Sequence, residues 1–394
     1  MIVPNSSFRP DPERAIYLDG AIDDEQVSKV TPQILALQSK NRDPISVFIV
    51  NSPGGSVASM EAILRLLNSS DQNFAGACQI ITVVTARAAS AAADLLASGD
   101  YAVAYPGSTI LYHGIRTPLR AATAEQTSMM AHYLRVTNDF YAMELARKIE
   151  FRFMYRFTML KSRFNEIRKE NPDKVLSDVD CFLELISRKL SEKAKKVFGR
   201  AVSRYGRYEA LLNYVTQQSI APNSNDSQAK IEGSRIKAIV DFEIASNGTD
   251  SAWTFKDGGI ARVADDFFIL NEYLDTQVSD RLLEWCKTYG RFALSREDIK
   301  EFDEIADESA RDSKMIEKVR PFLQPVLSFF VAFCHALQEG ENELTATDAY
   351  WLGLVDEVMG RQTLSAFRLM IEHEPDPPSQ AEQREIQSGT GEVL

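Results

Sequence analysis

The stretch Asn51-Ser52-Pro53-Gly54-Gly55-Ser56-Val57 (NSPGGSV) decides how the first third of the chain folds. It follows directly on the apolar run 45–50, whose length and β-branched content are typical of a strand buried on both faces. After it, apolar residues recur at helical spacing through residue 67. A double glycine lets the backbone turn sharply and leaves N–H groups open to a phosphate, a carboxylate or an oxyanion. The alternative is a plain strand-to-helix turn capped by Ser56.

The alternation of strand and helix continues on both sides of this unit. We expect strands at 15–18, 79–84 and 109–112, and helices at 24–39 and 88–97. Repeated strand–helix–strand units imply right-handed crossovers and a mostly parallel sheet. From 123 to 148 the pattern becomes one long helix without glycine or proline. The sequence therefore predicts an α/β fold.

Length and composition exclude several classes of protein. The chain has 394 residues, 44% of them apolar, so it can bury a core and is not disordered as a whole. Its net charge of −12 argues against a dedicated nucleic-acid binder. The cysteines lie too far apart to predict a zinc cluster or a disulfide framework: Cys78, Cys181, Cys286 and Cys334. The longest apolar run, 326–337, is too short to cross a membrane, and the first residues lack the pattern of a signal peptide, so we expect a cytoplasmic protein.

Two residues could carry chemistry. Ser90 ends the segment Ala86-Arg87-Ala88-Ala89-Ser90 at a predicted helix start, where free backbone N–H groups can stabilise charge during acyl transfer. Its alternative role is a helix N-cap. His113 follows the predicted strand 109–112 and is one of four histidines in the chain. It is a candidate general base, with a packed or surface histidine as the alternative.

Taken in order, these segments resemble the proteolytic subunit of Clp protease (ClpP) and its relatives in the ClpP/crotonase superfamily. The matching motifs are RAIYLDGAIDD (14–24), NSPGGSV (51–57), ARAAS (86–90), STILYH (108–113) and the closing segment LTATDAYWLGLVDEV (344–358). The resemblance implies an α/β fold with the repeated β-β-α spiral core of that superfamily.

The family core lacks a block that this chain carries in its middle. The resemblance implies a ClpP-like core in two parts, residues 1–148 and 339–371, with a mostly helical insertion at 149–338 between them. Residues 372–394 hold three prolines and little apolar content, so we expect a disordered tail there. Within the insertion, 236–255 suggests a small β-hairpin. Residues 151–210 hold 15 Lys and Arg against 8 Asp and Glu. This basic stretch could bind an acidic partner, RNA or another subunit, or it could form a solvated helical face.

Carried over position by position, the resemblance implies a serine endopeptidase. Ser90 would be the nucleophile, His113 the base, and the N–H groups of Gly55 and Ala91 the oxyanion hole. Such an acyl-enzyme route needs no cofactor and no metal. The substrate would be a peptide or an unfolded protein, and a separate ATPase would be needed for unfolding. The family also implies a homo-oligomer, with no membrane or nucleic acid as a partner.

The carboxylate that would orient His113 is not assigned. The family position falls on Leu337, and four carboxylates remain as candidates: Glu339, Glu341, Asp178 and Asp180. Two alternatives stay open. One is a catalytically silent ClpP-like scaffold or binding protein, which the missing carboxylate favours. The other is a crotonase-like acyl-CoA enzyme, which dependence of the activity on CoA would favour.

Overall fold

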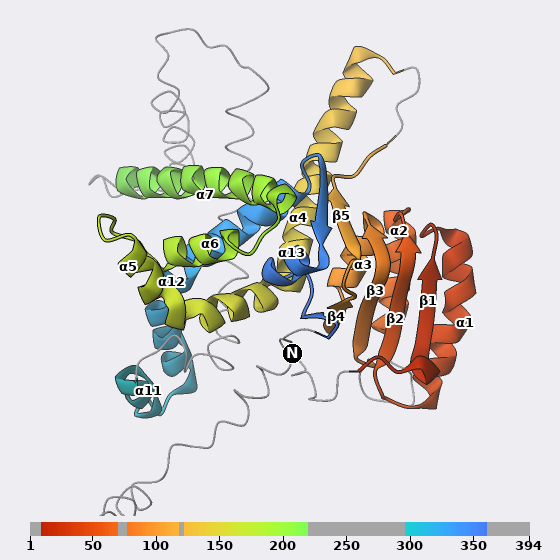
Figure 1. The fold of residues 1–394 in the computed structure, drawn as a ribbon, viewed down its shortest axis with the longest axis horizontal. Coiled ribbons are helices and arrows are strands. Elements are labelled where there is room, and N and C mark those ends of the chain that lie inside the picture. The colour runs from red at the N-terminus through yellow and green to blue at the C-terminus, as the bar shows by residue number, and fades with distance from the viewer. Residues whose placement is uncertain (1–8, 70–76, 118–121, 220–295, 361–394) are drawn as a thin grey trace, which may run out of the picture.

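The computed structural model describes residues 9–69, 77–117, 122–219 and 296–360 (Figure 1). Within these residues, seven strands form one sheet, with helices packed against it and a helical region beside it. The expected hairpin at 236–255 and the expected tail at 372–394 lie outside the described residues. The predicted α/β fold class with a large helical region is confirmed.

The sheet is mostly parallel, as the strand–helix alternation predicts. Its strands are β1 (Ala15–Asp19), β2 (Ile45–Ser52), β3 (Ile80–Ala89), β4 (Tyr101–Ala104), β5 (Thr109–His113), β6 (Glu341–Thr345) and β7 (Glu357–Val358). The order β1-β2-β3-β4-β7 is parallel throughout, β5 adds to β3 in parallel, and β6 pairs with β5 in the antiparallel direction. Strands β4, β6 and β7 were not predicted from the sequence.

Along one edge, strand β3 pairs with two strands in succession. Its residues 81–84 pair with β4, and its residues 87–89 pair with β5. Because Ala88 and Ala89 are used in this second ladder, the helix expected from residue 88 begins only at Ala91. Ser90 therefore lies at the point where a long buried strand changes into a helix.

The first three helices lie against this sheet. They are α1 (Asp24–Lys40), α2 (Val57–Leu67) and α3 (Ala91–Ala97). Each of the first two has a side-chain cap: Asp23 Oδ1 accepts from Gln26 N at 2.9 Å, and Ser56 Oγ accepts from Ser59 N at 3.2 Å. The predicted Ser56 cap is thus present.

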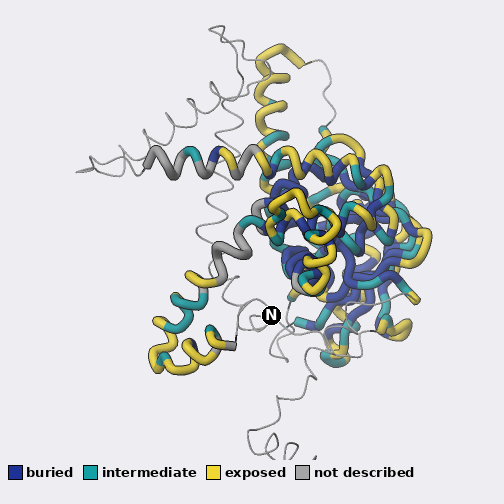
Figure 2. Tube along the Cα trace, turned by 60° about the vertical axis from the view of Figure 1, so that its left-hand side comes forward, coloured by how far each residue is buried: buried dark blue, intermediate teal, exposed yellow. Residues whose placement is uncertain are grey.

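The long helix α4 (Ala124–Leu160) continues beyond the end at residue 148 expected from the sequence. Its later part buries Ile149, Phe153 and Phe157 at four-residue spacing, which keeps one apolar face on the core. Its first turns extend away from the body and are largely exposed (Figure 2). None of the described helices is long and apolar enough to cross a membrane.

Further helices follow α4 along the chain. They are α5 (Phe164–Glu170), α6 (Asp178–Ser187), α7 (Glu192–Ser219), α11 (Arg296–Asp303), α12 (Glu308–Leu337) and α13 (Ala346–Trp351), with short 3-10 turns at Pro12–Arg14 and Lys161–Arg163. Phe153 stacks on Phe330 with ring centroids 4.5 Å apart, and Phe182 meets it edge-on at 5.2 Å. One buried apolar cluster runs from the sheet into these helices, so the expected boundaries at 148/149 and 338/339 stay predictions.

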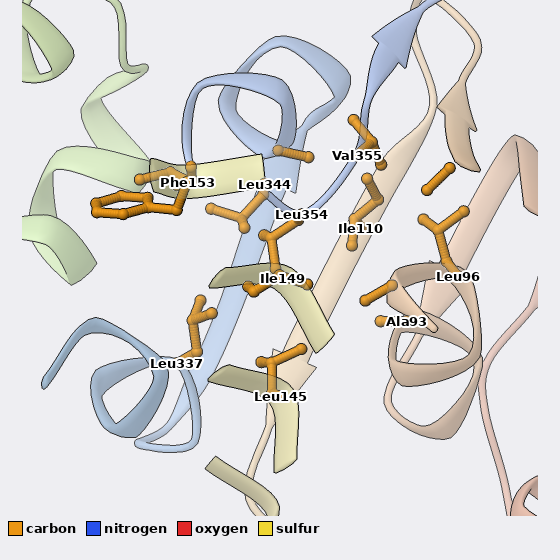
Figure 3. Packing of buried hydrophobic residues seen from close by; sticks show 14 of the residues in the cluster. Ala93, Leu96, Ile110, Leu145, Ile149, Phe153, Leu337, Leu344, Leu354 and Val355 are labelled. Atoms are coloured by element: carbon orange, nitrogen blue, oxygen red, sulfur yellow. The ribbon is translucent and has the colours of Figure 1, made fainter. Parts of the chain in front are cut away.

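The closing segment returns to the sheet that holds Ser90 and His113. Strand β6 lies beside β5 with His113 opposite Glu341, and β7 lies beside β4. Figure 3 shows its side chains meeting those of α3, α4 and β5, among them Leu344, Leu354, Val355, Ile110, Ala93, Ile149 and Phe153. A buried ion pair fastens the contact, with Arg152 Nε 2.7 Å from Asp356 Oδ2.

Candidate active site

The first of two strand-to-helix turns joins β2 to α2 and is built on glycine. Gly55 has φ +156°, and a Cβ at this position would lie 2.2 Å from Ile22 O. The loop is held by Ile22, whose N–H donates to Gly54 O at 2.9 Å and whose carbonyl accepts from Ser56 N at 2.8 Å. The N–H of Gly55 has no acceptor among the described residues. It is therefore open to an anionic ligand.

The second turn joins β3 to α3 and is built on Ser90. Its φ of 54° and ψ of −127° make Ser90 the one non-glycine residue with positive φ in the described ranges. Such a conformation costs on the order of 1–3 kcal/mol and persists where the surroundings enforce it. The backbone N–H donates to Leu111 O at 2.8 Å. Ser90 occupies the N-cap position of α3, as one alternative expected, but its side chain makes no capping hydrogen bond.

The two turns touch. A Cβ on Gly54 would lie 2.4 Å from Ala89 O and 2.7 Å from Ser90 Cβ, so only a glycine lets the loops approach this closely. Gly55 and Ala91 each lie one residue away from this contact. Like that of Gly55, the N–H of Ala91 has no acceptor within the part of the chain that the structure describes. Two unbonded donors thus lie beside the contact between the turns, and an oxyanion site is built from donors of this kind.

His113 ends β5 on the strand next to Ser90. The register pairs Ala89 with Leu111, which places His113 two residues further along on the same face of the strand as Leu111. Its Nδ1 lies 2.7 Å from Gly114 O. No hydrogen bond joins it to Ser90 Oγ in the described residues. Ser90 and His113 therefore follow or end neighbouring strands but are not hydrogen-bonded to each other. Catalytic hydrogen bonds are often long or absent in sites without a ligand.

Asp94 lies one helical turn after Ser90 and was missed by the sequence analysis. Burial raises its pKa to about 6, against the opposing charges of Lys148 and His113. Burial, with a smaller contribution from the Asp94 charge, also raises the pKa of Tyr112 well above its usual value. The hydroxyl of Tyr112 donates to Ala93 O at 3.1 Å and so ties β5 to α3. A carboxylate inside the apolar helix Ala91–Ala97 is the signal that could have revealed this group.

None of the four carboxylates proposed as partners of His113 bonds to it in the described structure. Glu341 faces His113 across the β5–β6 ladder, but its side chain is exposed and pairs with Arg116 at 2.9 Å. The other three are engaged elsewhere: Glu339 with Arg204, Asp178 with Arg168, and Asp180 with the backbone and hydroxyl of Ser177. Leu337, at the family position, is fully buried.

Comparison with known proteins bears on this arrangement. Residues 9–143 match the model of the Clp protease family. Over 131 residues the chain is 34% identical to the ATP-dependent Clp protease proteolytic subunit of Carsonella ruddii (strain PV), covering 32% of this chain and 61% of that protein. Over 103 residues it is 38% identical to the ATP-dependent Clp protease proteolytic subunit 2 of Leifsonia xyli subsp. xyli (strain CTCB07), covering 26% of this chain and 44% of that protein.

The matched region contains both turns, Ser90 and His113. The predicted resemblance to Clp protease proteolytic subunits is therefore confirmed over residues 9–143. The chain covers less than two thirds of each of these relatives, and most of its own length lies outside the matches.

Proposed function

We propose that the chain is a serine endopeptidase of the Clp type. The observation that carries this proposal is the strained backbone of Ser90 beside two unbonded N–H groups. A residue that only turned the chain would be glycine here, because glycine adopts positive φ without strain. Keeping a serine in this conformation favours a role for its hydroxyl.

The chemistry follows from the positions of these groups. The Ser90 hydroxyl would attack the carbonyl carbon of a peptide bond while His113 Nε2 takes the hydroxyl proton. The carbonyl oxygen, now negative, would accept from the N–H groups of Gly55 and Ala91. His113 would then give its proton to the leaving amine, and water would release the acyl group by the same steps. The route uses no cofactor and no metal.

The exposed part of α4 supports assembly with further copies of the chain. Met129, Tyr133, Val136 and Phe140 are 73%, 63%, 51% and 54% exposed and recur every three to four residues along one helix face. Such a stripe suits a matching apolar helix. We infer a homo-oligomer joined through this face, acting on peptides or unfolded proteins. Because both relatives are named ATP-dependent, a separate ATPase would supply unfolding.

One observation favours the catalytically silent alternative. In the described structure Ser90 and His113 are not hydrogen-bonded, and the proposed carboxylate partners of His113 are engaged elsewhere. A scaffold would tolerate this arrangement. An enzyme requires that the two side chains meet when substrate binds.

Labelling with a fluorophosphonate separates the two functions. The purified full chain should form an adduct and hydrolyse peptides, and Ser90→Ala should lose both, with a rate loss of at least about 10³-fold. Ser56→Ala is the matched control, because Ser56 also begins a helix but caps it. Its labelling should equal wild type. An unlabelled wild-type protein, or undiminished hydrolysis by Ser90→Ala, would reject the proposal.

A further inference from the structure

The contact between His113 and Gly114 fixes the position of a proton. A carbonyl oxygen can only accept a hydrogen bond, so the 2.7 Å contact from His113 Nδ1 to Gly114 O requires hydrogen on Nδ1. The neutral ring then carries its free electron pair on Nε2. This is the tautomer that a general base for Ser90 needs, and in a full catalytic triad a carboxylate enforces it.

The peptide group that accepts this bond is itself held from its other side. The N–H of the Gly114–Ile115 peptide belongs to Ile115 and donates to Asn138 Oδ1 at 2.6 Å. Asn138 lies on α4. A donor on one side and an acceptor on the other polarise a peptide group, which makes its oxygen a stronger acceptor.

Packing leaves this peptide group little freedom. A Cβ on Gly114 would lie 2.7 Å from Gln338 O, at the end of α12, and 2.8 Å from Asn138 Nδ2. The Gly114 carbonyl is therefore aimed at His113 by contacts from two helices. Helix α12 lies wholly beyond the matched residues 9–143, whereas Asn138 on α4 lies within them.

We propose that the Gly114 carbonyl takes the place of the triad carboxylate, with Asn138 as the positioning residue that holds it. This inference rests on the proposed function and adds the orientation of its base. The nearby carboxylate of Asp94, on α3, has a pKa that the charges of Lys148 on α4 and of His113 lower against the effect of burial. No hydrogen bond connects Asp94 to the ring in the described structure.

The first test varies the acceptor on α4. Asn138→Leu removes it and should lower kcat for peptide hydrolysis by about 10- to 100-fold, a typical cost for a partner that orients a functional group, with KM unchanged. Asn138→Asp keeps an oxygen acceptor and should stay within a few-fold of wild type. Thr137→Val, which alters the neighbouring α4 residue whose hydroxyl bonds only to Tyr133 O, is the control and should be unchanged. Equal losses in Asn138→Leu and Asn138→Asp would overturn the proposal.

The second test neutralises the carboxylates one at a time. Asp94→Asn, Glu339→Gln, Glu341→Gln, Asp178→Asn and Asp180→Asn should each keep kcat within about tenfold of wild type. In proteases with a full triad, the corresponding amide costs about 10⁴-fold. A loss of that size in any one variant would identify a triad carboxylate and overturn the proposal.

The third test does not depend on activity. With ¹⁵N-histidine labelling, only four side chains contribute signals, and His113→Ala assigns the one of interest. We expect the Nδ1–H tautomer in wild type and in Ser90→Ala, and its partial loss in Asn138→Leu. A dominant Nε2–H tautomer would overturn the inference even where hydrolysis depends on Ser90. Retention of Nδ1–H in a protein that fails to label would instead contradict the proposed function alone.

Discussion

The two strand-to-helix turns of this molecule solve the same geometric problem in opposite ways. The turn after β2 places glycines at positive φ, and Ser56 caps the helix that follows. The turn after β3 places Ser90 at positive φ and leaves its helix without a side-chain cap. In the first turn, glycines adopt the positive φ and the Ser56 hydroxyl is hydrogen-bonded. In the second turn, a serine adopts the positive φ, and its hydroxyl makes no capping hydrogen bond. The difference supports the role proposed for the Ser90 hydroxyl, and five substitutions, two of them matched controls, can sharpen or break this comparison.

The largest effect is expected at Gly54, where the two turns meet. Gly54→Ala adds a methyl group 2.4 Å from Ala89 O at a φ of +87°. Backbone strain and overpacking together should lower the free energy of unfolding by about 3 kcal/mol or more. The displaced Ala89–Ser90 backbone should also reduce hydrolysis. Chemical denaturation and peptide turnover measure the two effects.

Gly107→Ala provides the matched control for Gly54. Gly107 has nearly the same φ, +85°, but a Cβ there meets nothing within 4 Å. Only the backbone cost of about 1 kcal/mol should remain, with full activity. Equal destabilisation by the two variants would show that the contact between the turns is not tight.

An intermediate effect is expected one helical turn after Ser90. The pKa of Asp94 is raised from 3.8 to about 6, so the folded state holds this proton more tightly than the unfolded chain does. Stability should therefore fall as pH rises from about 4 to 6, and the loss should persist above that range. For this half-buried group the loss is on the order of 2 kcal/mol. Asp94→Asn should be more stable than wild type at pH 7.

Unfolding of Asp94→Asn and wild type across this pH range checks the prediction. The difference in unfolding free energy between the two proteins should grow between pH 4 and pH 6 and then level off. A difference that stays constant with pH would mean that folding does not raise the pKa of Asp94.

The smallest effect is expected for glycine substitutions at the two serines, which should change the free energy of unfolding in opposite directions. Ser90→Gly relieves the positive φ and should stabilise the fold by about 1 kcal/mol while abolishing hydrolysis. Ser56→Gly removes a cap at an ordinary φ of −69° and should destabilise by a few tenths of a kcal/mol. Thermal unfolding of the two variants measures this. Destabilisation by Ser90→Gly would contradict the strain attributed to Ser90.

The sequence predicted the parts of this comparison that depend on local pattern. The buried run 45–50 and the helical spacing after it correspond to β2 and α2, because hydrophobic periodicity follows directly from which faces are buried. The short strand β6 (Glu341–Thr345) was missed because only one of its two buried positions is apolar, Leu344, while the other is Asn342. Its place beside β5 is set by pairing across more than two hundred residues.

For the candidate site, the motifs supplied the residue identities and the structure supplied what no motif encodes. Ser90, His113, Gly55 and Ala91 were named from the sequence, and their catalytic roles remain predictions. The positive φ of Ser90 occurs directly after β3 has paired first with β4 and then with β5, at the start of α3. The contact from His113 to Gly114 depends on Asn138 and Gln338, which only tertiary packing brings together.

The buried pair between Arg152 and Asp356 bears on the order in which a newly made chain matures. Arg152 also donates to the carbonyls of Ala97 and Gly99, at 2.8 and 2.5 Å, so one guanidinium joins the end of α3 to the closing segment. During synthesis, Ser90 and His113 emerge long before Asp356 does. A nascent chain that has not reached residue 338 also lacks the wall behind Gly114. If the chain is the peptidase proposed above, we expect an unfinished chain to lack that activity until the closing segment docks.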